Sequence, residues 1–265
     1  CDSFATRDQS RANLRAGPAS RGYEEQAMDE KRTASNTAAE QRDIQKQAAC
    51  VAGDIDAVAR YWAIRKQELL ADAASTFISF VEPAFLYDMP PFIEPDSFNV
   101  MFTEWMLFEY SFRNGRTPLE EYAAHPPVGA KALHLDHVRQ ICETQTFSRF
   151  IIHDKDTRSG MAALEDIQTA RRYDVYDPEL CKRARWRSGT IGERIACVDG
   201  LWVPLANTRL YDRAAPADTA LDGPGFFHPE DRVRKPEAEH ASFYLRLVRD
   251  IIGIDGRYRH TATIP

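Results

Sequence analysis

Hydrophobic positions follow a helical period in the first part of the chain. Apolar side chains there recur at steps of three and four residues, which places them on one helix face. They are Ile55, Val58, Ala59, Trp62, Leu69 and Leu70. The run from residue 23 to about 74 is rich in residues that favour helix. Up to Gln47 it has almost no large apolar residue, so that part is either a solvated helix or disordered. Residues 1–22 are predicted to be a disordered lead-in.

The second helical pattern is the densest aromatic stretch in the chain. Its apolar residues share one broad face, and they are Phe98, Met101, Phe102, Trp105, Phe108 and Phe112. Asp96 is a predicted N-cap, and Asn114-Gly115 a left-handed exit. We interpret the aromatic face as buried core rather than as a ligand pocket. Glu104 and Glu109, at the edge of this face, are expected to face solvent.

After this stretch the periodicity changes from helical to alternating. Thr117 to Glu120 form a capping box with proline at the first helical position, and another helix is predicted over about 130–143. Five short β-rich runs follow in 147–213, and Asp199-Gly200 is a two-residue hairpin signal. So many short strands predict a small antiparallel β-barrel, SH3-like or OB-like.

The last part of the chain is predicted to be a loop followed by an amphipathic helix over 236–252. The fold class expected is therefore α+β. Its parts are a disordered lead-in (1–22), a helical region (23–146), a small β-barrel (147–213), and a loop with a C-terminal helix (214–265).

Composition and charge limit the class of protein. The chain has 265 residues, of which 43% are hydrophobic and 28% charged, as in ordinary globular proteins. No run approaches the roughly 18 apolar residues of a membrane span. The net charge is −6, with seven basic against fourteen acidic residues in 51–146 and twelve against ten in 147–213. This balance argues against coating nucleic acid wholesale, but it leaves room for one local basic patch.

The cysteines favour a reducing compartment. They are odd in number, widely spaced and without a CxxC pair, so buried thiols in a cytoplasmic protein are favoured over disulfides, and a structural zinc of the usual kind is not expected. The chain starts with Cys1, as a mature envelope lipoprotein would, and a polar tether would suit one. A fragment that merely starts there explains the same fact. A lipoprotein anchored at Cys1 is therefore an alternative.

The most basic segment is CKRARWRSG, residues 181–189, between two predicted strands. Cationic side chains around an exposed aromatic are the means by which single-strand binders on small barrels hold phosphates and bases. We therefore predict a surface for nucleic acid or an acidic protein partner. Its residues are Lys182, Arg183, Arg185, Trp186 and Arg187, with Arg171 and Arg172 as an extension. Alternatively, the arginines pair with the acidic helical half or with another subunit, and Trp186 fills the barrel.

The best metal-like grouping is ALHLDHVRQICE. His134 and His137 are one turn apart and can share a helix face, as a metal requires, and Asp136, Cys142 and Glu143 lie nearby in the sequence. Asp136 falls on a different face from His137, however, and no HExxH pattern supplies a general base. The two histidines are therefore weak metal candidates, and a metal-dependent hydrolase that uses them is the rival function.

No catalytic signature of the GxSxG, P-loop or GxGxxG kind is present. We therefore predict a non-enzymatic binding or regulatory protein with no cofactor.

A resemblance supports the same fold. FTEWMLFEYSFRNGRTPLEEY, joined to LEDIQTARRYDVYD and ERIACVDGLWV, resembles a group of uncharacterised bacterial proteins. There, a helix of the type F-x-E-W-x-L-F-[DE] is followed by N/D-G-R-T-P-L-E and a β module, over the equivalent of residues 60–211. Many members carry a SEC-C metal-binding motif elsewhere. The resemblance implies a shared fold and no particular activity. The SEC-C cysteines are missing here, so that zinc site is not carried over.

Overall fold

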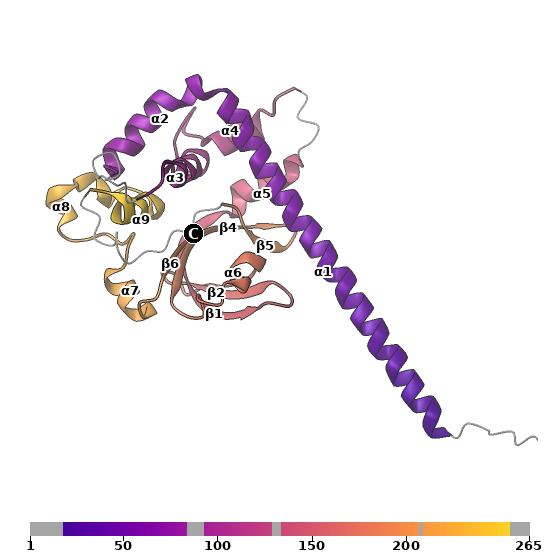
Figure 1. Ribbon diagram of the computed structural model, residues 1–265. Helices are drawn as coiled ribbons and strands as arrows, with labels where there is room; N and C mark the ends of the chain where they lie inside the picture. Colours follow the sequence, from indigo (N-terminus) through magenta and orange to yellow (C-terminus); the bar gives the residue numbers. More distant parts are fainter. Residues whose placement is uncertain (1–17, 84–92, 129–133, 207–208, 255–265) are drawn as a thin grey trace, which may run out of the picture. The chain divides into compact units, whose positions relative to one another are not determined.

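The computed structural model describes residues 18–83, 93–128, 134–206 and 209–254 (Figure 1). The chain divides into two compact units, residues 1–45 and 46–265. The long helix α1 (Pro18–Ile64) begins inside the predicted lead-in, of which residues 1–17 lie outside the described part. In the first unit the side chains of residues 38–45 are mostly exposed, and Arg42 Nε donates to the carbonyl of Ala38 at 3.1 Å. Of the two alternatives predicted there, the solvated helix is present.

The second unit begins with the apolar end of α1 and continues into α2 (Lys66–Val81). The predicted stripe is buried at Ile55, Val58, Trp62 and Leu69, while the side chain of Leu70 lies outside the described part. The single run predicted to about residue 74 is broken at Arg65, whose N–H bonds three residues back to the carbonyl of Trp62 at 3.0 Å. This tighter turn starts α2 in a new direction.

Helix α3 (Pro95–Phe108) carries the aromatic face. Trp105 is 5% exposed and its ring lies 5.3 Å from that of Phe77 in α2, so the prediction that this face is core is confirmed. The predicted N-cap at Asp96 is wrong, because Glu94 is the N-cap and Pro95 the first helical residue. The helix also ends before Phe112.

The predicted left-handed turn and capping box both form after α3. Asn114 and Gly115 have φ of 54° and 75°, within a turn that leads to α4 (Pro118–Ala124). Glu120 N–H donates to Thr117 Oγ1 at 3.2 Å, and Thr117 N–H donates to Glu120 Oε2 at 2.7 Å. Helix α5 (Leu135–Thr144) follows. The start predicted near residue 130 falls on residues 129–133, which lie outside the described part.

In the described chain six strands form one sheet, and five of them close into a barrel. They are β1 (Thr146–Asp156), β2 (Met161–Asp166), β3 (Arg172–Tyr176), β4 (Thr190–Val198), β5 (Leu201–Pro204) and β6 (Leu210–Asp212). The order β1-β2-β3-β5-β4 closes through a β1–β4 pairing, and β6 adds to β4. All pairings are antiparallel except β3–β5. This order, with a short helix between β3 and β4, is that of the OB-like alternative rather than the SH3-like one.

The connections between the barrel strands are partly as predicted. Asp199 and Gly200, with φ of 48° and 80°, form the predicted two-residue hairpin between β4 and β5. Helix α6 (Pro178–Lys182) was not predicted, and it is capped by Asp177 Oδ1, which accepts from the N–H groups of Glu179 and Leu180. The last predicted β run is divided into β5 and β6.

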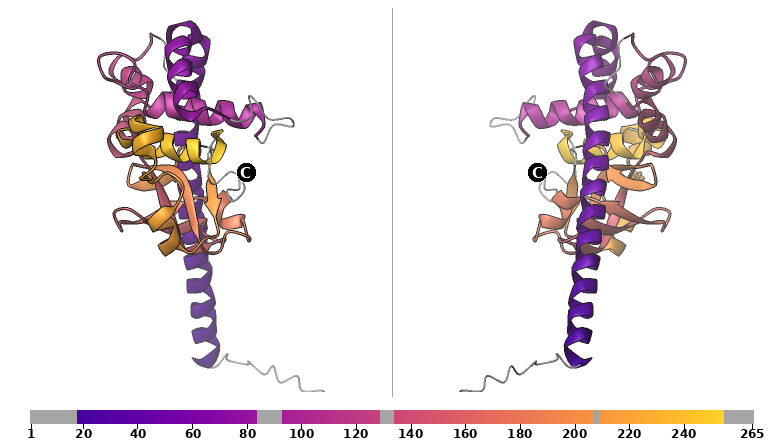
Figure 2. Two further views of the ribbon diagram at one scale, coloured as in Figure 1. Left: turned by 90° about the vertical axis from the view of Figure 1, so that its left-hand side faces the viewer. Right: turned by 90° about the vertical axis from the view of Figure 1, so that its right-hand side faces the viewer.

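The C-terminal part contains α7 (Pro216–Asp222), α8 (Asp231–Arg234), a 3₁₀ turn η2 (Pro236–Glu239) and α9 (Phe243–Ile252). The predicted loop thus contains two short helices, and the final α-helix starts only at the cap Ser242. Helix α9 lies between α2 and the barrel in both Figure 1 and Figure 2. Tyr244 packs edge-on against Phe147 of β1, with ring centroids 4.6 Å apart. In the described part of the chain, no helix has the length and apolar character to cross a membrane.

Candidate functional site

The predicted binding segment forms the connection from α6 to β4, residues 183–189, here called the basic connection. Its aromatic residue is not exposed. Trp186 is 4% exposed, and its ring stacks on Tyr211 of β6 with centroids 5.0 Å apart. The prediction that Trp186 is available to stack on a base is wrong, because the ring is more stable among the apolar residues of the barrel core. The alternative, that Trp186 fills the barrel, is correct.

The arginines on either side of Trp186 are held facing outwards. Arg183, Arg185 and Arg187 are all exposed. Lys155 Nζ of β1 donates to the carbonyl of Arg183 at 2.7 Å, and Tyr211 Oη donates to the carbonyl of Ser188 at 2.5 Å. The backbone of the basic connection is therefore tied to the barrel, and its guanidinium groups extend from a fixed base. Burial lowers the pKa of Lys155.

Lys182 is the basic residue of this segment that forms an ion pair within the described chain. Lys182 pairs with Glu179 at 2.8 Å, one turn away in α6. Arg183 lies over the ring of Trp186 at 4.9 Å, and Arg187 Nε donates to the carbonyl of Ala184 at 3.2 Å. Among the described residues, none of the three arginines forms an ion pair. The alternative that they pair with the acidic helical half is not found in this part of the chain.

The predicted extension of the surface lies elsewhere. Arg171 and Arg172 lie at the start of β3. The basic connection begins after α6, which follows the other end of β3, so the length of the strand separates the two groups. Arg172 Nε donates to Glu165 at 2.8 Å, which neutralises it. Arg171 lies over the half-buried ring of Trp202, 5.6 Å from its centroid. The seven predicted residues therefore form two groups and a buried anchor.

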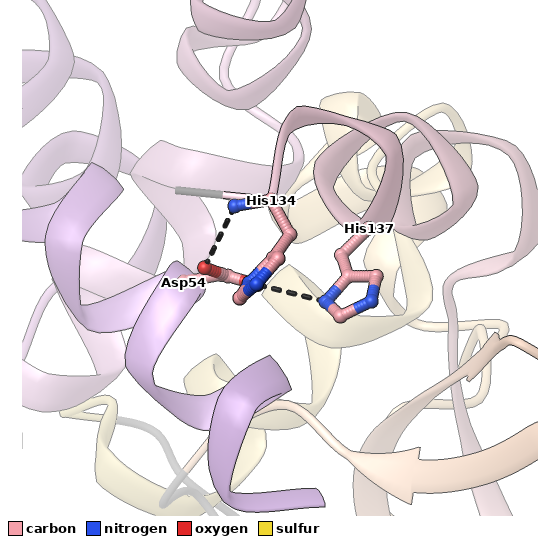
Figure 3. A group of neighbouring side chains, drawn as sticks. All are labelled: Asp54, His134 and His137. Atoms are coloured by element: carbon pink, nitrogen blue, oxygen red, sulfur yellow. Dashed lines mark hydrogen bonds and ion pairs between the residues drawn. The ribbon is translucent and has the colours of Figure 1, made fainter. Parts of the chain in front are cut away.

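The two histidines meet a residue that the sequence did not indicate. Asp54 of α1 points at both imidazoles, with its Oδ2 atom 3.3 Å from His134 Nδ1 and 2.9 Å from His137 Nδ1 (Figure 3). Candidate metal-ligating atoms of the three residues lie within 4.8 Å of one another. Asp136 instead pairs with Arg139 on the surface, at 2.7 Å. Asp54 was missed because it lies 80 residues before His134.

A second carboxylate completes this cluster. His137 Nε2 lies 3.1 Å from Asp199 Oδ2 in the β4–β5 hairpin. Gln140 Nε2 donates to Asp199 Oδ1 at 2.9 Å, and the backbone N–H of Asp199 donates to Gln140 Oε1 at 2.7 Å. The hydrogen bond from Gln140, with a further one from His137, lowers the pKa of Asp199.

Cys142, which follows the histidines in the sequence, differs from them in its ability to bind a metal. Burial raises the pKa of its thiol to about 12, so the group stays protonated at neutral pH. It is not among the metal-capable groups found in the described chain.

The expectation that Glu104 and Glu109 face solvent is wrong. Arg194 of β4, itself 2% exposed, donates from Nε to Glu104 Oε1 at 3.1 Å and from Nη2 to Glu109 Oε1 at 2.5 Å. Its Nη1 donates to Gln145 at 2.6 Å. A buried arginine with three acceptors compensates the desolvated carboxylates. This network joins α3 to the barrel.

A cavity of about 410 Å³ lies between α1 and α3. Phe108 and Glu104 line it, together with Ile55, but Trp105 is not among its lining residues. Of the aromatic face, Phe108 borders this cavity, and Phe102 lines a second cavity of about 310 Å³ together with Trp62.

Comparison of the chain with protein-family models, with curated proteins and with solved structures found no match. The resemblance to uncharacterised bacterial proteins therefore stays a prediction.

Proposed function

We propose that this is a non-enzymatic binding or regulatory protein that binds single-stranded nucleic acid through the basic connection of its barrel. The observation that carries the proposal is the set of three exposed arginines, Arg183, Arg185 and Arg187, without a carboxylate partner in the described chain. Unpaired guanidinium groups on a fixed backbone match the phosphates of a nucleic-acid strand.

The form of the barrel favours nucleic acid over an acidic protein partner. OB-like barrels bind single strands by combining a cationic track with flat groups for stacking. Here the ring of Trp186 is buried, so stacking would come from guanidinium planes, which also pack against bases. The acidic net charge of −6 confines such binding to this local surface.

The buried tryptophan contributes to this proposal in a different way from the one predicted. Trp186 anchors the middle of the basic connection, and Arg185 and Arg187 flank it on the outside. A segment already held in place loses less conformational entropy when it binds a ligand. Trp186 therefore supports affinity without touching the ligand.

The proposed location is the cytoplasm. Cys50, Cys142, Cys181 and Cys197 are free thiols in the structure, which fits a reducing compartment. We also propose that the protein belongs to the bacterial group that its sequence resembles.

The experiment is a fluorescence anisotropy titration of the full chain with a labelled single-stranded oligonucleotide of about 16 nucleotides, the upper site size of an OB-like barrel. Replacing Arg183, Arg185 and Arg187 together with Ala is expected to weaken binding at least about tenfold. The matched control replaces Arg232 and Arg234, two exposed arginines of α8, with Ala. This control is expected to bind as the unaltered chain does.

Two outcomes would contradict the proposal. One is no binding of the oligonucleotide at low salt. The other is binding that the triple variant keeps or that the α8 variant loses equally. Binding of polyglutamate but not of the oligonucleotide would assign the basic connection to an acidic protein partner instead.

A further inference from the structure

We infer that Asp54, His134 and His137 form a binding site for a divalent transition-metal ion of the zinc class. This site lies apart from the basic connection, and it does not depend on nucleic-acid binding. Its residues come from α1 and from the start of α5, which lie far apart in the sequence and meet only in the fold (Figure 3).

The distances between the donor atoms fit a metal. Both Nδ1 atoms converge on one oxygen, Asp54 Oδ2, at 3.3 Å from His134 and 2.9 Å from His137. A tetrahedral zinc with ligands at about 2.1 Å places neighbouring ligand atoms about 3.4 Å apart. The two nitrogen–oxygen distances are close to this spacing, and the donor atoms of all three residues lie within 4.8 Å of one another.

The outer nitrogen of His137 supplies an independent observation. A histidine that ligates a metal through one nitrogen almost always donates its other N–H to a carboxylate or carbonyl, which fixes the ring. His137 Nε2 lies 3.1 Å from Asp199 Oδ2. The side-chain amide of Gln140 donates to Asp199 Oδ1 and accepts from the backbone N–H of Asp199, which holds this residue in place. The arrangement from the metal position outwards is therefore imidazole, carboxylate and amide, each oriented by the next.

The charge at the site also favours a cation. Asp54 is 2% exposed, and within the described chain its ion-pair partners are the two histidines alone. Its other oxygen accepts from the backbone N–H of His134 at 3.2 Å. A buried carboxylate is costly unless a positive charge compensates it, and a divalent ion at the position that both imidazoles face would provide that charge.

The donor set defines the class of ion. Two imidazoles and one carboxylate suit zinc, cobalt, nickel and copper, whereas magnesium and calcium prefer oxygen ligands alone. The side chain of His134 is 58% exposed, so the ion can enter from solvent and keep a water as its fourth ligand.

The position of the site predicts a structural effect. Asp54 lies on α1, the histidines on α5, and Asp199 on the hairpin between β4 and β5. An ion bound there would link α1 to α5 directly, and the contact of His137 with Asp199 would extend that link to the barrel. Since it binds only the folded chain, it is expected to raise the melting temperature by about 5–10 °C at a hundredfold excess over its Kd.

The test uses the full chain, first treated with a chelator and then dialysed. Isothermal titration calorimetry with Zn²⁺ is expected to show one ion per chain, and Co²⁺ is expected to give the visible absorption of a tetrahedral complex. Asp54→Asn and His137→Ala are expected to abolish binding of this ion. Asp199→Asn is expected to weaken it about 10- to 100-fold while leaving the stoichiometry at one.

The matched control is His153→Ala. His153 is a half-exposed histidine that contacts a carboxylate, Glu165, at 3.0 Å, and it lies outside the cluster. This variant is expected to bind zinc as the unaltered chain does. The inference is contradicted if the unaltered chain binds no stoichiometric ion, or if Asp54→Asn, which preserves the shape of the side chain, binds zinc as well as His153→Ala does.

Discussion

The barrel uses arginine in two opposite ways. Arg194 in β4 is buried, and its guanidinium donates to Glu104, Glu109 and Gln145. Arg185, in the connection that leads into the same strand, is exposed, and no carboxylate contacts it in the described chain. The role of each arginine in this protein therefore follows from its partners and its burial. The first holds the fold together, and the second is free to bind another molecule.

The largest expected effect comes from breaking the buried network. Arg194→Ala leaves Glu104 and Glu109 without their cation, and it is expected to lower the free energy of unfolding by about 3–5 kcal/mol. Urea denaturation followed by circular dichroism measures this loss. Arg185→Ala is the matched control, with an expected change within about 0.5 kcal/mol. Equal effects of the two substitutions would remove the distinction between the two kinds of arginine.

A second prediction concerns the anchor between the exposed arginines. Trp186→Ala removes a buried ring from the barrel core, and it is expected to cost about 3 kcal/mol of stability. It is also expected to weaken binding of the oligonucleotide, because the basic connection is no longer held in place. If Trp186→Ala loses stability and binds as tightly as before, Trp186 fills the barrel and nothing more.

A third prediction uses the buried acid Glu193, whose Oε2 atom lies 3.7 Å from Arg209 Nε. Glu193 is 1% exposed, and burial, together with the nearby Asp177, raises its pKa to about 8. The folded chain therefore keeps a proton that the unfolded chain releases near pH 4.5. The contribution of this group to the free energy of unfolding is fully present at low pH. It is lost, by about 1.4 kcal/mol per pH unit, as the pH rises between the pKa of the unfolded chain and that of the folded chain.

Glu193→Gln mimics the protonated form and is expected to remove this part of the pH dependence. The measurement is the unfolding midpoint of both chains from about pH 5 to about pH 8, roughly the range between the two pKa values. Parallel curves for Glu193→Gln and the unaltered chain would show that Glu193 is already ionised in the folded state.

Features encoded by neighbouring residues could be predicted from the sequence. The capping box from Thr117 to Glu120 and the hairpin at Asp199-Gly200 both form, because each depends on a few adjacent backbone groups. The OB-like order of the strands also agrees with the predicted small barrel. The fold class could thus be predicted from the turn-forming residues and from the periodicity of the hydrophobic positions.

The errors involve partners that are distant in the sequence. Glu104 was expected in solvent because its partner Arg194 is 90 residues away. Asp54 joins His134 across 80 residues, and no local pattern indicates that contact. Trp186 lies among arginines, and its burial depends on Tyr211 of a later strand. Periodicity shows which face of an element is apolar, and it does not show which charged residues meet.

The salt dependence of oligonucleotide binding shows whether the three arginines of the basic connection contact phosphates. Each phosphate neutralised on a single strand contributes about −0.7 to the slope of log K against log salt concentration. If Arg183, Arg185 and Arg187 hold phosphates, replacing all three with Ala reduces the magnitude of the slope by about 2, and replacing Arg232 and Arg234 leaves it unchanged. An identical slope in the triple variant and the unaltered chain would contradict the account.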